Sequence, residues 1–160
     1  IGYFKFEIIK AETPLFFDDK KKLSCLISAM QLIKILNAEA QPNIKVFNLI
    51  ENFFIILNSN EWIKNYILWE LRLFSYLGYN LELKKMVTKK TINDETYYEL
   101  KSSSVSRRIP NFLIENNVSA TENELFVGLK LVGDFLEKSI LKPNNLNQPI
   151  NRIQFLNNLK

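Results

Sequence analysis

The sequence predicts a mainly α-helical bundle that carries a small β-hairpin or irregular lobe and one N-terminal strand. Apolar residues recur at helical spacing over most of the 160 residues. The stretch 79–110 loses this periodicity and becomes rich in Thr, Ser, Val and Tyr, whereas residues 2–10 alternate as a strand does. Because 47% of the residues are hydrophobic, the chain can bury a sizeable core.

The composition excludes several classes of function. The chain has no histidine and a single cysteine, Cys25, which excludes imidazole catalysis, histidine metal ligation and an internal disulfide. No signal-peptide pattern and no apolar run of transmembrane length is present. A lone cysteine fits a reducing compartment, so we expect a cytoplasmic location. Because the chain begins with Ile1 rather than Met, we interpret it as a fragment.

The first predicted helix begins after Asp18 or Asp19 and runs to about Asn37. A second helix follows Pro42 and ends near Leu57. Short connections favour antiparallel neighbours. The expected buried stripes are Leu23, Leu26, Ile27, Met30, Ile33 and Leu36 in the first helix, and Val46, Phe47, Ile50, Phe53, Phe54 and Leu57 in the second.

The stretch 60–79 is predicted to form the central, buried helix. Asn60 is its expected N-cap, and Gly78 is expected to end it. Apolar side chains cover most of its circumference: Ile63, Tyr66, Ile67, Leu71, Phe74 and Leu77, with Trp62, Trp69, Leu73 and Tyr76 widening the stripe. The strip expected to face water consists of Glu61, Lys64, Asn65, Leu68, Arg72 and Ser75.

A further helix is predicted over 118–142. Its start fits a capping box between Thr121 and Glu124, and the pair Ser119 and Glu122 competes for that role. Its expected buried stripe is Leu125, Leu129, Val132, Leu136 and Ile140.

Two glycines, Gly128 and Gly133, interrupt this helix and predict that another backbone packs closely there. Pro143 ends the helix. Pro149 opens a last amphipathic helix, whose expected buried residues are Ile150, Ile153, Leu156 and Leu159.

The excess positive charge is concentrated between Lys84 and Arg108. This segment holds seven basic and three acidic residues, so its net charge of +4 equals that of the whole chain. Attraction to a polyanion should therefore centre here. The candidate DNA-binding residues are Lys84, Lys85, Lys89, Lys90, Lys101, Arg107 and Arg108. Ordinary solvated lysines are the alternative, and Tyr97 and Tyr98 either stack on bases or lie half in the core.

Glu70 lies on the buried stripe of the central helix. A lone acid can suggest general acid–base chemistry, but no second carboxylate, histidine or glycine-rich phosphate loop accompanies it. We interpret it as a buried, hydrogen-bonded structural carboxylate and Cys25 as a core side chain. We therefore expect no catalytic residue and no enzymatic activity.

Three segments, taken in order, resemble the family of the bacterial recombination mediator RecO. They are WELRLFSYLGY at 69–79, LKLVGDFLE at 129–137 and GYFKFE at 2–7. The last resembles the strand that leaves the OB domain of the family. The resemblance implies that residues 1–12 are the last strand of a truncated OB-fold domain. It also implies that residues 15–160 form the helical C-terminal domain, with the lobe inserted at about 80–112.

The same resemblance implies a function in DNA repair and homologous recombination. The family binds single- and double-stranded DNA, the partner RecR and the acidic C-terminal tail of single-stranded DNA-binding protein. It promotes strand annealing and recombinase loading at the bacterial nucleoid, without covalent chemistry. The alternative is a helical protein–protein adaptor that does not contact DNA itself.

The chain departs from the family where a four-cysteine zinc site often lies. Met86 occupies the place of the first cysteine, and no cysteine follows Cys25. Thioether and amide groups cannot replace thiolates at tetrahedral zinc. We therefore expect no cofactor and a metal-free lobe, held together by Leu83, Val87, Tyr97, Tyr98 and Leu100.

A receptor for the acidic tail needs a cation beside an apolar surface. Lys64, Leu68 and Arg72 recur every four residues along the central helix and are the candidate tail-binding residues. The family carries basic residues near Ile67 and Leu68, which are apolar here. The alternative is a solvent-facing strip with an incidental leucine.

Overall fold

A computed structural model describes residues 7, 11–38, 41–92, 95–100, 107–115 and 117–159. The strand expected at 2–10, and with it the proposed OB-fold remnant, lies almost entirely outside the described residues. The helices are η1 (Thr13–Phe16), α1 (Lys20–Leu36), α2 (Ile44–Leu57), α3 (Trp62–Tyr76), α4 (Leu83–Met86), η2 (Asn111–Leu113), α5 (Glu122–Phe135), the π-helix η3 (Leu136–Leu141), η4 (Lys142–Asn144) and α6 (Ile150–Asn158). The strands are β1 (Val87–Ile92), β2 (Glu95–Leu100) and β3 (Arg108–Ile109).

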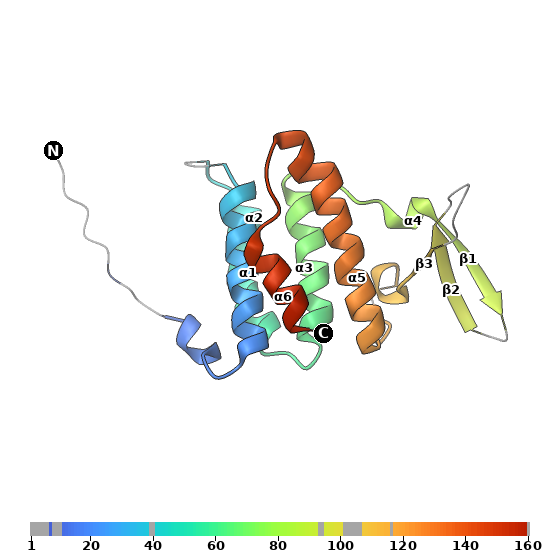
Figure 1. Cartoon of the computed structure of the whole chain (residues 1–160), viewed down its shortest axis with the longest axis horizontal. Helices are drawn as coiled ribbons and strands as arrows, with labels where there is room; N and C mark the ends of the chain where they lie inside the picture. Colours follow the sequence, from blue (N-terminus) through green and yellow to red (C-terminus); the bar gives the residue numbers. More distant parts are fainter. Residues whose placement is uncertain are drawn as a thin grey trace.

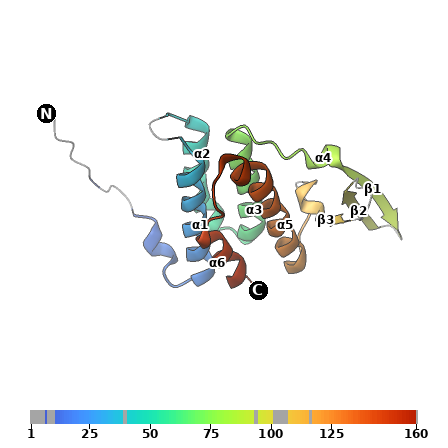
Figure 2. The same ribbon diagram turned by 45° about the horizontal axis from the view of Figure 1, so that its top comes forward.

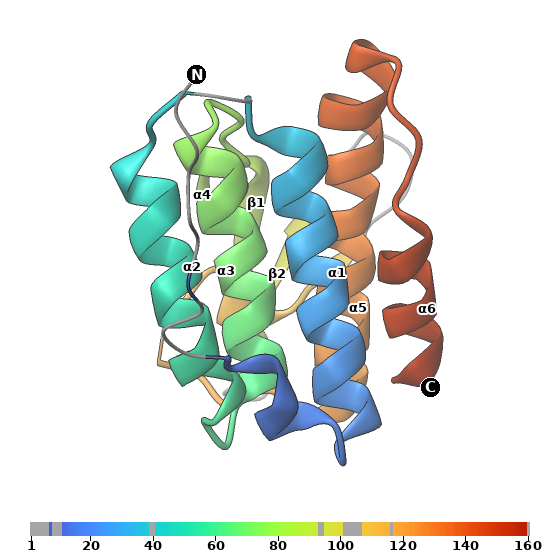
Figure 3. The ribbon, with the colours of Figure 1, turned by 90° about the vertical axis from the view of Figure 1, so that its left-hand side faces the viewer.

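The predicted architecture, a helical bundle with a small β lobe, is confirmed. Helices α1, α2, α3 and α5 lie side by side, and the short α6 packs on α1 (Figure 1, Figure 3). The lobe stands beyond α5, at the opposite end of the molecule from α1 and α2 (Figure 1, Figure 2). Among the described residues, no helix combines the length and the apolar character needed to cross a membrane.

Helix α3 occupies the middle of the bundle, as expected. Gly78 ends it with a φ of +92°, and the backbone N–H of Tyr79 donates to the Phe74 carbonyl at 2.8 Å. This left-handed glycine and the bond that follows it form a Schellman motif. The N-cap is Glu61 rather than Asn60, and it makes no side-chain capping bond. Tyr76, expected in the buried stripe, is exposed because it lies in the last turn, at the end of the bundle.

Helices α1 and α2 lie where the sequence predicts them, but their buried faces are rotated from the expected stripes. The Asp19 carboxylate accepts from the backbone of Lys21 and Lys22, and Asn43 caps α2. Ile27 and Phe47, both expected to be buried, are exposed. The interior instead takes a face of α1 that combines three small residues with two leucines. The buried residues of α1 are Cys25, Leu26, Ser28, Ala29 and Leu32.

The lobe is a three-stranded antiparallel sheet in the order β1-β2-β3. Of the two alternatives, a hairpin or an irregular lobe, the structure shows a hairpin, formed by β1 and β2. Val87 lies opposite Leu100, and Tyr98 lies opposite Ile109. One face of the sheet joins the bundle core through the buried residues Val87, Tyr98 and Ile109, together with Leu83 of α4. Of the residues expected to hold the lobe together, Leu83, Val87 and Tyr98 lie in this core and Leu100 packs against it, whereas Tyr97 does not belong to it. Ile109 is an additional member.

Helix α5 begins at the predicted capping box: the Thr121 hydroxyl accepts from the Glu124 backbone, and Glu124 accepts from the Thr121 N–H. The competing pair is not used. Side chains, not another backbone, approach the two glycines. A Cβ on Gly128 would lie 2.7 Å from Cζ of Phe112, and one on Gly133 would lie 2.5 Å from Nη1 of Arg152.

Helix α6 presents a different face to the core from the one expected. Ile150 is 71% exposed and Ile153 is also exposed, whereas Arg152 and Phe155 are fully buried. The apolar periodicity was misleading because a carboxylate inside the bundle requires the guanidinium of Arg152 as its partner. The helix is therefore turned so that Arg152 points inward.

Substituting Gly128 tests the close packing of α5 against the Phe112 ring. We expect Gly128→Ala to lower the free energy of unfolding by about 1–3 kcal/mol, because the Phe112 ring must move to admit the methyl group. This loss outweighs the roughly 1 kcal/mol that alanine gains over glycine in a helix. Urea denaturation measures the difference, with the exposed Lys130→Ala as a control expected within about 0.5 kcal/mol of the parent. A Gly128→Ala variant more stable than the parent would contradict the packing.

Candidate nucleic-acid interface

The lobe carries the candidate DNA-binding residues on several short elements. Lys84 and Lys85 lie on α4, Lys89 and Lys90 on β1, and Arg108 on β3, with Arg107 directly before it; all six are exposed. Lys101 lies outside the described residues. The structure therefore brings six of the seven residues onto one projecting lobe.

Carboxylates compensate part of this charge. The expectation of a freely cationic lobe needs correction, because four of its cations form ion pairs. Two pairs are local: Lys85 with Glu82 at 2.7 Å, and Lys90 with Glu99 across the hairpin. Two partners come from other elements: Glu115 lies 4.0 Å from Lys89, and Asp134 lies 3.4 Å from Arg107. The hydrogen bond that Lys90 donates to the Glu99 carboxylate raises the pKa of Lys90, so this lysine stays charged.

The two tyrosines of β2 are not free to stack on bases. Tyr97 is only 9% exposed, and the guanidinium of Arg108 lies over its ring, 4.2 Å from the centroid. Tyr98 is buried and donates a short hydrogen bond to Glu115, which raises the pKa of its hydroxyl. The alternative of tyrosines half in the core is therefore the correct one.

The zinc site that the resemblance implies does not fit this lobe. Its residues include no cysteine or histidine, and Cys25 is buried in α1. Within the described part of the chain, no three His, Cys, Asp or Glu side chains gather where they could hold a metal ion. Packing of Leu83, Val87, Tyr98 and Ile109 takes the place of metal ligation.

The row proposed for the acidic tail is only partly open to solvent. Arg72 is exposed and Leu68 is half-buried, but Lys64 is 7% exposed. Lys64 Nζ lies 2.6 Å from a Glu61 oxygen and donates to the Val118 carbonyl at 3.3 Å. The expectation that Lys64 faces water is therefore wrong, because the loop before α5 covers it.

A pocket of about 140 Å³ adjoins Lys64. Its apolar lining comes from the start of α3 and from the region where α5 begins: Trp62, Ile63, Ala120 and Leu125. A ligand that has a carboxylate next to an apolar group needs a cation beside an apolar pocket, and Lys64 and this pocket provide both.

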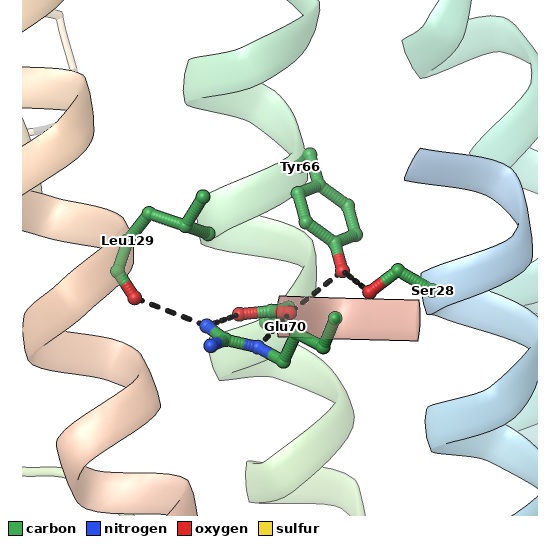
Figure 4. A network of polar contacts seen from close by, with 5 residues as sticks. Ser28, Tyr66, Glu70 and Leu129 are labelled. Atoms are coloured by element: carbon green, nitrogen blue, oxygen red, sulfur yellow. Dashed lines mark hydrogen bonds and ion pairs between the residues drawn. The ribbon is translucent and has the colours of Figure 1, made fainter. Parts of the chain in front are cut away.

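The interior of the bundle contains one continuous polar network around Glu70 (Figure 4). Arg152 donates through Nε to one Glu70 oxygen at 2.9 Å and through Nη2 to the other at 2.8 Å. Nη2 also donates to the Leu129 carbonyl at 3.0 Å. Glu70 and Arg152 are both 0% exposed. This bidentate pair is the strong form of a charge-assisted hydrogen bond, and it joins α3, α5 and α6.

Tyr66 and Ser28 extend the network to α1. The Tyr66 hydroxyl donates to Glu70 at 2.7 Å, and the Ser28 hydroxyl lies 3.1 Å from the Tyr66 oxygen. Since the single Tyr66 proton points to Glu70, Ser28 must be the donor in the second bond. Burial, reinforced by the charge of Glu70, raises the pKa of Tyr66 well above its usual value, so this tyrosine stays protonated.

This arrangement confirms that Glu70 is a buried, hydrogen-bonded carboxylate. Tyr66 and Arg152 donate to its oxygens and fix its position. The sequence analysis did not identify Arg152, the main partner of Glu70. The prediction that Glu70 is buried could have indicated such a partner, since a buried charge requires a counterion. Cys25 is fully buried as expected, and burial raises the pKa of its thiol, which keeps it unreactive.

Comparisons with known proteins agree with the resemblance. The family model described as Recombination protein O C terminal matches residues 18–145. The chain is 30% identical over 156 residues to the DNA repair protein RecO of Rickettsia africae, an alignment that covers 90% of this chain and 66% of the relative. The same identity holds over 161 residues for the RecO protein of Rickettsia bellii, covering 93% and 66%. The chain thus spans just under two thirds of these relatives, and no solved structure matches it.

Removing one member of the buried pair tests its structural role. We expect Arg152→Met to cost about 3–5 kcal/mol, because Glu70 is left buried without its counterion. The double variant Glu70→Gln/Arg152→Met should be more stable than Arg152→Met alone, since the remaining amide is neutral and still accepts from Tyr66. Chemical denaturation of the parent, both single variants and the double variant measures the coupling. Additive losses would contradict the assigned pairing.

Proposed function

Since the chain belongs to the recombination protein O family, we propose that it forms the helical domain of a DNA repair and recombination mediator. In this role the domain holds DNA for strand annealing and recombinase loading, and it makes or breaks no covalent bond. The observation that carries the proposal is the set of exposed cations on one projecting lobe. The lobe segment 84–108 has a net charge of +4, equal to that of the whole chain.

The ion pairs on the lobe are compatible with DNA binding. Exposed pairs such as that of Lys85 and Glu82 contribute only about 0–1 kcal/mol each, so a phosphate can replace the carboxylate. Lys84 and Arg108 are exposed and sit on the same lobe as the paired residues. Because β1 is an edge strand and its neighbouring side chains point to opposite faces, phosphates along its free edge would lie between Lys89 and Lys90, with Lys84 on the preceding α4.

A second function, that of a protein–protein adaptor without direct DNA contact, is favoured by the same four ion pairs. If the carboxylates remain in place, they cancel most of the field that would attract DNA. The two functions differ in how single-stranded DNA binding depends on salt. If the lobe contacts phosphates, counterions are released and the affinity falls steeply with salt; an adaptor shows no such DNA binding.

We also propose that the domain receives the acidic tail of single-stranded DNA-binding protein, and that RecR is a partner of the whole protein. The pocket beside Lys64 supports the tail site. Its apolar lining suits the apolar end of the tail, and Lys64 would exchange Glu61 for the terminal carboxylate. Arg72 lies eight residues further along α3, roughly 12 Å, where it can meet acidic residues upstream in the tail.

Neutralising lobe lysines tests DNA binding. We expect the triple variant Lys84→Gln/Lys89→Gln/Lys90→Gln to reduce the slope of log affinity for single-stranded DNA against log salt. The slope should become less steep by about 2, since each lost phosphate contact removes roughly 0.7. Fluorescence anisotropy over a salt series measures the slope. A matched variant, Lys21→Gln/Lys34→Gln/Lys138→Gln, removes the same charge from the bundle and should leave the slope nearly unchanged. Equal slopes in all three proteins would favour the adaptor.

Reversing the charge of Arg72 tests the tail site. We expect Arg72→Glu to weaken binding of an acidic tail peptide by about 1.5 kcal/mol, roughly tenfold, because it removes one charged hydrogen bond and adds repulsion. Anisotropy of a labelled peptide measures the change. Lys34→Glu, a charge reversal at another exposed position, on α1, is the control. If the two variants bind the peptide equally well, Arg72 is not part of the site.

A further inference from the structure

An open cleft of about 510 Å³ lies between the β lobe and the beginning of α5. The lobe contributes Tyr97, Arg108 and Asn111 to its walls, and α5 contributes Asn123, Glu124 and Val127. None of the candidate lysines lines it. The cleft is therefore distinct from the lysine surface, although both belong to the same lobe.

The most unusual feature of the cleft is a flat cation supported by a ring. The guanidinium of Arg108 lies over the Tyr97 ring at 4.2 Å from its centroid. The strand register explains this contact. Arg108 of β3 lies opposite Glu99 of β2, so Arg108 is a diagonal neighbour of Tyr97 on the same face of the sheet. Because Tyr97 is covered while Arg108 is exposed, the guanidinium is the flat surface offered to a ligand.

The polar groups of the cleft favour an uncharged ligand with hydrogen-bond donors. Glu124 is held in place by the capping box, where one of its oxygens accepts from the Thr121 N–H and hydroxyl, each at 2.9 Å. A fixed carboxylate repels phosphate but accepts from exocyclic amino groups, such as that of cytosine. The amide of Asn123 lies one residue away on the same wall.

We propose that this cleft holds one unpaired nucleobase, stacked on Arg108 with its amino edge toward Glu124 and Asn123. The strand's phosphates then follow the lysines outside the cleft. This inference rests on the proposed DNA-binding function and deepens it: the lobe recognises single strands by an exposed base as well as by charge. A base paired within a duplex is not available for such stacking.

The test separates base from backbone. Anisotropy at fixed salt compares a labelled oligodeoxycytidine with an abasic oligomer of the same length and charge, using the whole chain. We expect the parent to bind oligodeoxycytidine about tenfold more tightly than the abasic strand. Arg108→Lys keeps the charge but loses the planar surface, so it should reduce this ratio about fivefold without weakening abasic binding.

The control variant is Lys84→Gln, which should weaken binding of both oligomers by the same factor. Thermal melting confirms that each variant is folded. If Arg108→Lys leaves the ratio unchanged, or weakens both oligomers equally, the base site is wrong while DNA binding by the lobe stands. If the parent binds neither oligomer, both the base site and the proposed function fail.

Discussion

The fold depends on the buried ion pair between Glu70 and Arg152, which joins helices far apart in the sequence at the centre of the bundle. Two charges removed from water are tolerated only when each is paired and hydrogen-bonded. Tyr66 and the Leu129 carbonyl complete most of the network, while Nη1 of Arg152 has no hydrogen-bond partner. The absence of a side chain at Gly133 leaves room for this guanidinium. The pair therefore fixes which face α6 presents and how closely it approaches α5.

Most features governed by neighbouring residues could be predicted from the sequence, although the N-cap of α3 lies one residue after the expected Asn60. Asp19 caps α1, Thr121 opens α5 and Gly78 ends α3, because a cap depends on atoms only a few residues away. Features governed by distant residues could not. Ile150 faces solvent because α6 turns Arg152 inward, and Lys64 is covered because it donates to the Val118 carbonyl, in a loop more than 50 residues later. Neither of these long-range contacts can be predicted from the spacing of apolar residues along the chain.

The same division applies to the candidate site. The sequence located the cationic segment, since charge can be counted along the chain, but it did not reveal the acids that meet those cations. Glu115 and Asp134 come from elements outside the segment and approach Lys89 and Arg107 only in the folded protein. The stack of Arg108 on Tyr97 likewise depends on strand register. The lobe is therefore a mixed surface that carries cations, their carboxylate partners and the Arg108 guanidinium supported by Tyr97.

The central claim is that the bundle is a support and that the lobe, with the adjoining start of α5, is the surface that meets DNA. Backbone amide NMR of the chain titrated with single-stranded DNA tests this division most directly. The account predicts that shifted amides cluster in 84–92, 107–111 and 121–127, whereas those of α1, α2 and α6 stay in place. Shifts centred on α1 and α2, or no shifts at all, would contradict it.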